Sequence, residues 1–268
     1  MIRFLEGDKP YVIGIDLHGT LLNENWKIEK PHQVSLINAF MNLKHQAYIL
    51  IITGNDLSFV KEHVPEPVFS QIDGFILENG TVFSDGTYER LLAEENKIAS
   101  IKLLEAELKI LQIPEVLFFA RRLSTISMFT RNQGIGVPPT ALFSQINALL
   151  KGHHDNDDFY ITHSDVAVDI VPKGHTKWTA INYLFPNKKL IAIADSYNDR
   201  EFLCKADLPI IPANASPKIE AELLNRGFHI LPLTRFQWLS IHKNAYKSPS
   251  NNTLGVIEAL QAIEANLE

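Results

Sequence analysis

Short apolar runs alternate with amphipathic stretches along both ends of the chain. Six apolar runs predict strands, most of them with polar or glycine-containing tips, at residues 11–17, 47–52, 74–77, 190–194, 208–211 and 229–232. Amphipathic stretches predict helices at residues 31–44, 176–184, 216–225 and 254–267. Because strands alternate with helices, we expect an α/β fold with a Rossmann-like, doubly wound parallel sheet.

The middle of the chain has a different pattern. A hairpin is expected at residues 81–87, with Asp85 and Gly86 at its turn. Two helices and four strands follow, at residues 91–111, 116–119, 125–130, 139–150, 158–162 and 166–171. We therefore expect an α+β cap domain at residues 84–171, inserted into a core made of residues 1–83 and 172–268. Residues 243–252 are polar and predict a loop before the last helix.

Composition and charge restrict the function classes. A net charge of −6 argues against a general nucleic-acid binder, which would carry a basic face. The single Cys204 excludes an intrachain disulfide and a cysteine zinc cluster, and it fits a reducing cytosol. No stretch approaches the roughly 20 apolar residues of a membrane span, and no signal peptide is apparent. We expect a cytoplasmic monomer or weak homodimer that binds neither nucleic acid nor membrane.

Polar residues follow several of the predicted strands. Asp16 ends the first strand, Thr53 follows the second, and Asp195 and Asp199 follow a later one, while Lys177 opens a helix. The carboxyl ends of parallel strands converge, so these residues can share a crevice. Two carboxylates suit Mg²⁺, and a lysine and a hydroxyl can bind phosphoryl oxygens. Singly, each residue also fits a turn, a helix cap or a solvated surface, and the combination carries the prediction.

These residues form four motifs that resemble those of the haloacid-dehalogenase-like (HAD) phosphohydrolases. The motifs are residues 16–22, 51–55, 172–177 and 193–199, with support from residues 78–80 and 214–215. Within the family, the chain is similar to the branch with an inserted α/β cap (subfamily IIB), which includes Cof-type, sucrose-phosphate, trehalose-phosphate and mannosyl-3-phosphoglycerate phosphatases. The resemblance spans nearly the whole chain, and it implies a Mg²⁺-dependent phosphatase with an aspartyl-phosphate intermediate.

The resemblance also implies roles for individual residues. The catalytic residues would be Asp16, His18 and Lys177. The metal ligands would be Asp16, Asp195, Asp199 and His18, the last through its backbone carbonyl. The phosphate would be bound by Thr53, Gly54, Asn55, Lys177 and Asn198. Candidates for substrate selection in the cap are Arg121, Arg122, Arg131 and His163, although at least one of Arg121 and Arg122 is expected to be a solvated surface charge.

His18 departs from the family pattern, which has an acid two residues after the nucleophile. That acid protonates the leaving oxygen, and losing a general acid typically costs roughly 10²–10⁴-fold in rate. Three interpretations follow: a phosphatase in which His18 replaces the acid, an enzyme for activated substrates or phosphotransfer, and a weakened or inactive protein that binds a phosphorylated ligand or partner. We predict a phosphohydrolase for a small phosphorylated metabolite, with a sugar phosphate as the preferred class.

Overall fold

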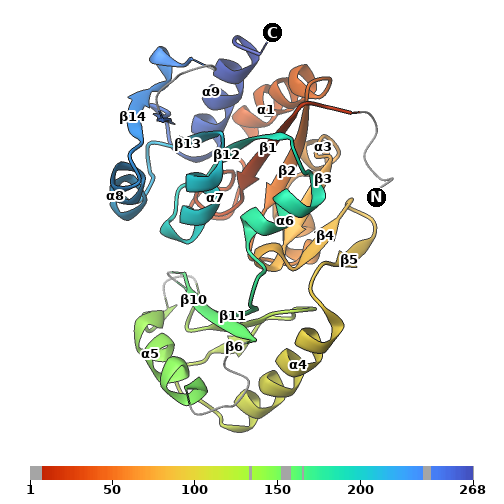
Figure 1. Cartoon of the computed structure of the whole chain (residues 1–268), viewed down its shortest axis with the longest axis vertical. Coiled ribbons are helices and arrows are strands. Elements are labelled where there is room, and N and C mark those ends of the chain that lie inside the picture. Colours follow the sequence, from red (N-terminus) through yellow and green to blue (C-terminus); the bar gives the residue numbers. More distant parts are fainter. Residues whose placement is uncertain (1–7, 133–134, 152–157, 165, 238–242, 268) are drawn as a thin grey trace.

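Two β-sheets organise the chain in a computed structural model that describes residues 8–132, 135–151, 158–164, 166–237 and 243–267. Figure 1 shows the larger sheet and its helices in the upper part of the view and the smaller sheet with two helices below. Two connecting segments join the parts, one entering α4 and one leaving β11 (Figure 1). The described residues include no helix long and apolar enough to cross a membrane.

The larger sheet has nine strands in the order β14-β15-β13-β12-β1-β2-β3-β4-β5. They are β1 (Tyr11–Asp16), β2 (Ala47–Ile52), β3 (Gly74–Leu77), β4 (Val82–Ser84), β5 (Glu89–Leu91), β12 (Lys189–Ile193), β13 (Leu208–Ile211), β14 (His229–Pro232) and β15 (Asn244–Lys247). All neighbours from β14 to β3 pair in parallel, whereas β4 and β5 are antiparallel additions at one edge. The predicted α/β fold is therefore confirmed.

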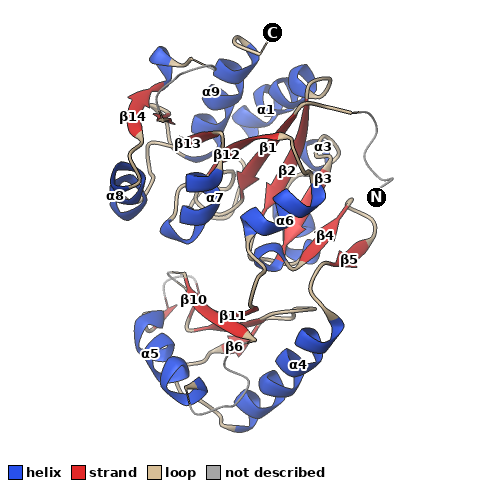
Figure 2. Cartoon of the chain, in the orientation of Figure 1, coloured by secondary structure: helices blue, strands red, loops and turns tan. Residues whose placement is uncertain are grey.

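Helices cover both faces of this sheet, as Figure 2 shows. Ile13 packs in a core with α1 (Lys30–Leu43) and α9 (Asn252–Glu264), whereas its neighbour Val12 packs in a second core. Helices α6 (Lys177–Leu184), α7 (Arg200–Lys205) and α8 (Pro217–Asn225) supply that second core. Because alternate residues of a strand point to opposite faces, burial on both sides explains why β1 and β2 are continuous apolar runs. The remaining short elements are α2 (Leu57–His63), α3 (Glu66–Phe69), η1 (Glu78–Gly80), η2 (Tyr197–Asp199) and η3 (Leu233–Arg235).

The smaller sheet is antiparallel, with the order β10-β11-β7-β6. Its strands are β6 (Phe118–Phe119), β7 (Ile126–Phe129), β10 (Phe159–His163) and β11 (Ala167–Pro172), and a short ribbon pairs β8 (Arg131–Asn132) with β9 (Ile135–Gly136). Helices α4 (Glu95–Ile110) and α5 (Pro139–Leu150) pack on it around a separate apolar core that includes Ile101, Met128 and Leu142. We call this part the cap.

Two features differ from the sequence prediction. The β4–β5 hairpin pairs with β3, so the larger sheet extends to Leu91, past the predicted boundary at residue 84. Residues 243–252 were predicted to form a loop, but β15 lies inside the sheet between β13 and β14. Only Ala245 and Tyr246 of β15 are fully buried. Because polar residues flank these two, the sequence pattern does not indicate a strand here.

Candidate functional site

Lys177 joins two buried carboxylates at the carboxyl end of the larger sheet. Its Nζ donates to Asp16 Oδ1 at 2.6 Å and to Asp199 Oδ1 at 2.5 Å. Asp16 is the last residue of β1, and Lys177 is the first residue of α6, whose N-terminus is fixed by a capping box between Thr176 and Thr179. The structure therefore brings together these three charged residues, which the sequence placed in one crevice.

Asp195 completes the group through Thr20. The Thr20 hydroxyl lies 2.9 Å from Asp195 Oδ1 and 3.4 Å from Asp16 Oδ2, so it bridges the two carboxylates. A Cβ on Gly19 would lie 2.4 Å from Asp195 Oδ2, and Gly19 has φ +72°, which explains why a glycine occupies this turn. Thr20 stood inside a recognised motif, but the sequence alone assigned it no function.

Crowding of like charges perturbs this cluster. Burial, followed by the charge of Asp199, raises the pKa of Asp16 to about 8. Burial also raises the pKa of Asp195 to about 6. For Lys177, burial opposes the charged form, but Asp16 and Asp199 outweigh it and raise its pKa above the ordinary value. The single lysine does not offset the negative charge of the three carboxylates, and the arrangement favours an added cation.

Asn198 is not part of this cluster. Its side chain is exposed on the η2 turn, and no hydrogen bond joins it to another described residue. Its neighbour Asp199 is buried instead and accepts a hydrogen bond from Ser196 Oγ at 2.8 Å. The structure therefore brings Asp199 to Lys177 and leaves Asn198 at the surface.

The turn after β2 presents Thr53, Gly54 and Asn55. Thr53 Oγ1 accepts hydrogen bonds from the Asn55 backbone N–H at 3.1 Å and from Asn55 Nδ2 at 3.2 Å. With both acceptor positions of the hydroxyl occupied, its own hydrogen is left for another acceptor, such as a phosphoryl oxygen. A Cβ on Gly54 would lie 3.1 Å from Asn79 Oδ1, so this turn packs closely against η1.

His18 lies in an aromatic environment beside this turn. Its Nδ1 is 3.1 Å from Asn55 Nδ2, and its ring packs 5.0 Å from Phe59 and 5.7 Å from Trp26. The Nε2 atom is buried and has no hydrogen-bond partner among the described residues. Burial, and then the positive charges nearby, lower the pKa of His18 to about 4, so the ring is neutral at pH 7.

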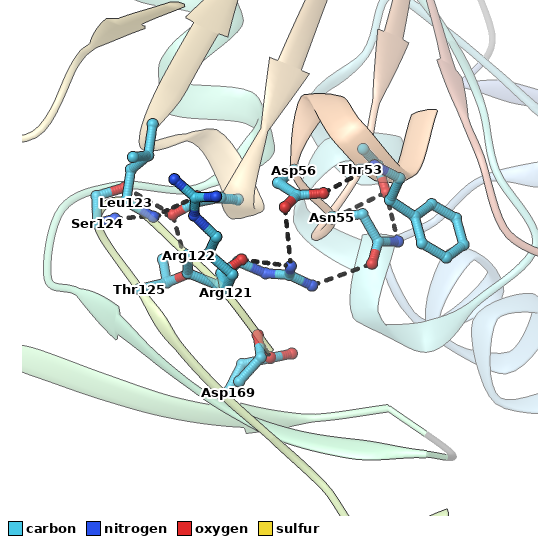
Figure 3. A network of polar contacts seen from close by, with 12 residues as sticks. Thr53, Asn55, Asp56, Arg121, Arg122, Leu123, Ser124, Thr125 and Asp169 are labelled. Atoms are coloured by element: carbon cyan, nitrogen blue, oxygen red, sulfur yellow. Dashed lines mark hydrogen bonds and ion pairs between the residues drawn. The ribbon is translucent and has the colours of Figure 1, made fainter. Parts of the chain in front are cut away.

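The cap reaches this site through the loop between β6 and β7. Arg122 Nη2 donates to Asn55 Oδ1 at 3.1 Å, and Arg122 Nη1 lies 3.9 Å from Asp56 Oδ2. Figure 3 shows these contacts, with Asp169 of the cap sheet below them. Only 6% of the Arg122 side chain is exposed, whereas Arg121 is exposed. Of the cap candidates, Arg122 is the one that these contacts bring to the turn after β2.

The other two cap candidates lie elsewhere. His163 is on β10, where its Nδ1 is 3.1 Å from the carbonyl oxygen of Ser164 and its ring packs against Phe143. Arg131 is on the β8–β9 ribbon. Neither has a contact with the described residues of the Asp16 cluster.

Glu78 fastens the cap loop to the larger sheet. Its carboxylate is buried and accepts hydrogen bonds from Leu123 N at 2.7 Å, Ser124 N at 2.9 Å, Ser124 Oγ at 2.9 Å and Thr125 Oγ1 at 3.2 Å. Glu78 and Asn79 have φ values of +48° and +58°, a left-handed pair that turns this carboxylate toward the cap. The sequence placed Glu78 in a supporting motif but did not signal this role.

Comparisons with known proteins agree with this geometry. The family model of the haloacid dehalogenase-like hydrolases matches residues 13–128 and 136–224. A Plasmodium vivax protein described as a HAD/COF-like hydrolase superposes with a TM-score of 0.66 at 14% identity, over 97% of this chain and 96% of that one. A haloacid dehalogenase-like hydrolase from Bacteroides thetaiotaomicron gives a TM-score of 0.61 at 15% identity, over 95% and 100%.

A trehalose-6-phosphate phosphatase related protein gives a TM-score of 0.58 at 13% identity, over 95% of this chain and 97% of that one. At such identities these structures establish the fold alone. Curated protein sequences give no match.

Proposed function

Since this chain belongs to the haloacid dehalogenase-like hydrolases, we propose that it is a Mg²⁺-dependent phosphohydrolase that uses Asp16 as its nucleophile. The observation that carries the proposal is the bridge from Lys177 to Asp16 and Asp199, beside the Thr20-linked Asp195. Buried carboxylates gathered at the tip of a parallel sheet, with one lysine between them, suit the binding of a cation and a phosphoryl group.

The donor set fits Mg²⁺. Among the described residues, no three His, Cys, Asp or Glu side chains surround a point that could hold a metal ion. Mg²⁺ needs fewer, because it keeps several waters and binds one or two carboxylates together with phosphate oxygens. Asp16 and Asp195 would hold it, with the backbone carbonyl of His18. A bound Mg²⁺ would neutralise phosphoryl charge, and it would lower the raised pKa values of both carboxyl groups.

Each residue of the site has a separate role in the proposed reaction. Asp16 attacks phosphorus with a carboxylate oxygen, and the bond from phosphorus to the leaving oxygen breaks. Lys177 and Thr53 hold the non-bridging oxygens, and Asp199 keeps Lys177 in position through its 2.5 Å contact. Water next attacks phosphorus, the bond to Asp16 breaks, and the carboxylate and inorganic phosphate are released.

The substrate we propose is a small phosphorylated metabolite. The sequence resemblance makes sugar phosphates the first candidates. The replacement of the family's acid by His18 supports a second candidate function, a protein that binds phosphorylated ligands without turnover.

A phosphatase screen tests this proposal. Sugar phosphates, acetyl phosphate and p-nitrophenyl phosphate are offered to the wild-type protein and to Asp16→Asn, with Mg²⁺ or with EDTA. We expect turnover that needs both Mg²⁺ and Asp16. Phosphate release that is unaffected by EDTA or by Asp16→Asn would contradict the mechanism, and phosphate binding without turnover would favour the second candidate.

A further inference from the structure

A chain of hydrogen bonds connects the cap to His18. It runs from Arg122 Nη2 to Asn55 Oδ1 at 3.1 Å, and from Asn55 Nδ2 to His18 Nδ1 at 3.1 Å. These three residues are far apart in sequence, and they meet because the loop after β6 reaches the turn after β2 (Figure 3). The direction of each bond in this chain determines where His18 can carry a proton.

The direction of the first bond is fixed by chemistry. A guanidinium group can only donate hydrogen bonds, so the Asn55 atom beside Arg122 must be the amide oxygen. The amide nitrogen of Asn55 then faces His18 and Thr53, and its two hydrogens go to His18 Nδ1 and Thr53 Oγ1. His18 Nδ1 is therefore an acceptor and has no hydrogen. The ring can hold a hydrogen only on Nε2.

That hydrogen is out of reach of a substrate. The Nε2 atom is buried and has no partner among the described residues, while the ring packs against Trp26 and Phe59. The nitrogen of His18 that faces Asn55 is thus unprotonated, and the nitrogen that carries the hydrogen is buried. In this state of the protein His18 has no proton to give to a leaving oxygen.

Contacts of the residues next to Arg122 fix the position of its side chain beside Asn55. The two residues that follow it, Leu123 and Ser124, donate their backbone N–H groups to the buried carboxylate of Glu78 at 2.7 and 2.9 Å. Arg122 Nη1 also donates to the carbonyl oxygen of Arg121 at 3.0 Å. With the cap docked, the Arg122 donor stays at Asn55 and prevents the amide from turning its oxygen toward His18.

We propose that Arg122 is a positioning residue that, through Asn55, holds His18 without an available proton, so that the site acts on phosphates whose leaving group departs unprotonated. This inference rests on the proposed function. When Asp16 forms its bond to phosphorus, the leaving oxygen keeps the electron pair of the broken bond and departs as an anion, which takes a proton from solvent. Acyl phosphates, phosphoanhydrides and aryl phosphates have such leaving groups, whereas sugar phosphates leave as the anions of ordinary alcohols.

A leaving-group series tests the substrate class. With Mg²⁺ present, kcat/KM is measured for acetyl phosphate, p-nitrophenyl phosphate, phenyl phosphate and glucose 6-phosphate, on the wild type and on His18→Asp. Because missing acid assistance costs roughly 10²–10⁴-fold, we expect the wild type to be at least about 100-fold slower on glucose 6-phosphate than on p-nitrophenyl phosphate. His18→Asp should raise the rate on glucose 6-phosphate relative to the rate on acetyl phosphate, so that the ratio between the two substrates narrows.

The outcomes separate this inference from the proposed function. Wild-type turnover that does not depend on the leaving group overturns the inference alone. A wild type inactive on all four substrates, with an active His18→Asp, also overturns it but keeps the phosphohydrolase site. Inactivity of both proteins on all four substrates overturns the proposed function and the inference together.

The positioning role is tested by the tautomer of His18, which needs no turnover. The full-length protein with ¹⁵N-labelled histidine and Mg²⁺ is studied by long-range ¹⁵N–¹H NMR, and His18 is assigned by its loss in His18→Asp. We expect Nδ1 without hydrogen in the wild type and in the matched control Arg121→Met. In Arg122→Met, signals of the Nδ1–H form should appear, and in Asn55→Asp a carboxylate beside the ring should make that form dominant. A protonated Nδ1 in the wild type, or the wild-type spectrum in both Arg122→Met and Asn55→Asp, would overturn the inference.

Discussion

Glu78 and the cluster of Asp16, Asp195 and Asp199 lie at the carboxyl end of the larger sheet, and their carboxylates are stabilised in opposite ways. Glu78 accepts four hydrogen bonds from the cap loop, so the protein itself satisfies this carboxylate. Asp16, Asp195 and Asp199 share one lysine, and the pKa values of Asp16 and Asp195 are raised to about 8 and about 6. Glu78 makes a structural connection, whereas the excess negative charge of the Asp16 cluster favours an added cation.

The largest expected effect is the loss of activity when the proposed nucleophile of the Asp16 cluster is replaced. Asp16→Asn removes the nucleophile, and we expect kcat to fall by roughly 10⁴-fold or more. The matched control is Asp85→Asn at the β4–β5 turn, where the carboxylate accepts hydrogen bonds from the backbone N–H groups of Thr87 and Tyr88. Turnover of p-nitrophenyl phosphate with Mg²⁺ measures both variants, and equal activities would show that Asp16 is not the nucleophile.

The second effect concerns the pH dependence of stability without metal. The folded pKa of Asp16 is about 8, above the ordinary value of 3.8, so the folded state binds this proton more tightly than the unfolded state. That contribution to stability is complete below about pH 4, and it is lost as the pH rises through about 8. We expect the Tm of the wild type, relative to Asp16→Asn, to fall between pH 5 and pH 9 in EDTA. A difference in Tm that is constant over this range would contradict the raised pKa.

The third effect is stabilisation by Mg²⁺. A ligand that binds only the folded state adds about 2.7 kcal/mol to the free energy of unfolding at 100 times its Kd. We expect Mg²⁺ to raise the Tm of the wild type, and to raise it much less in Asp195→Asn. The control is Asp207→Asn, which removes a surface partner of Lys189. Equal shifts in both variants would place the binding of Mg²⁺ elsewhere.

The smallest effect concerns Glu78, whose carboxylate accepts its hydrogen bonds from the cap loop. Glu78→Gln replaces one acceptor oxygen with an NH₂ group that faces the donors of the cap loop, and we expect a loss of about 1–3 kcal/mol in unfolding free energy. Chemical denaturation at pH 7 measures this loss, with and without Mg²⁺. In contrast to Asp16→Asn, the loss should not depend on Mg²⁺. A variant as stable as the wild type would show that these four hydrogen bonds do not hold the cap.

The sequence could predict the centre of the site because several of its residues stand at the ends of strands that the apolar pattern predicts. Asp16 and Asp195 follow continuous apolar runs, and parallel strands of a doubly wound sheet bring their ends together. Asn198 and Asp199 were both predicted to join them, but only Asp199 is buried beside Lys177, and Asn198 is exposed. A single residue step within one 3₁₀ turn decides between the two, and sequence pattern does not resolve that step.

The contacts with the cap were beyond sequence reasoning. Arg122 and Asn55 are 67 residues apart, and their hydrogen bond depends on how the cap is docked. The sequence named Arg122 among four candidates without a way to rank them. Likewise, the four donors of Glu78 are two backbone N–H groups and two hydroxyl groups, which have no distinctive pattern along the chain.

The central claim is that Asp16 carries the phosphoryl group during turnover. Its most direct test is rapid acid quenching of the wild-type protein during hydrolysis of ³²P-labelled acetyl phosphate with Mg²⁺, followed by peptide mapping. We predict label on the peptide that contains Asp16, and none on that peptide in Asp16→Asn. Continued turnover with no labelled peptide, or with label on a different residue, would contradict the mechanism.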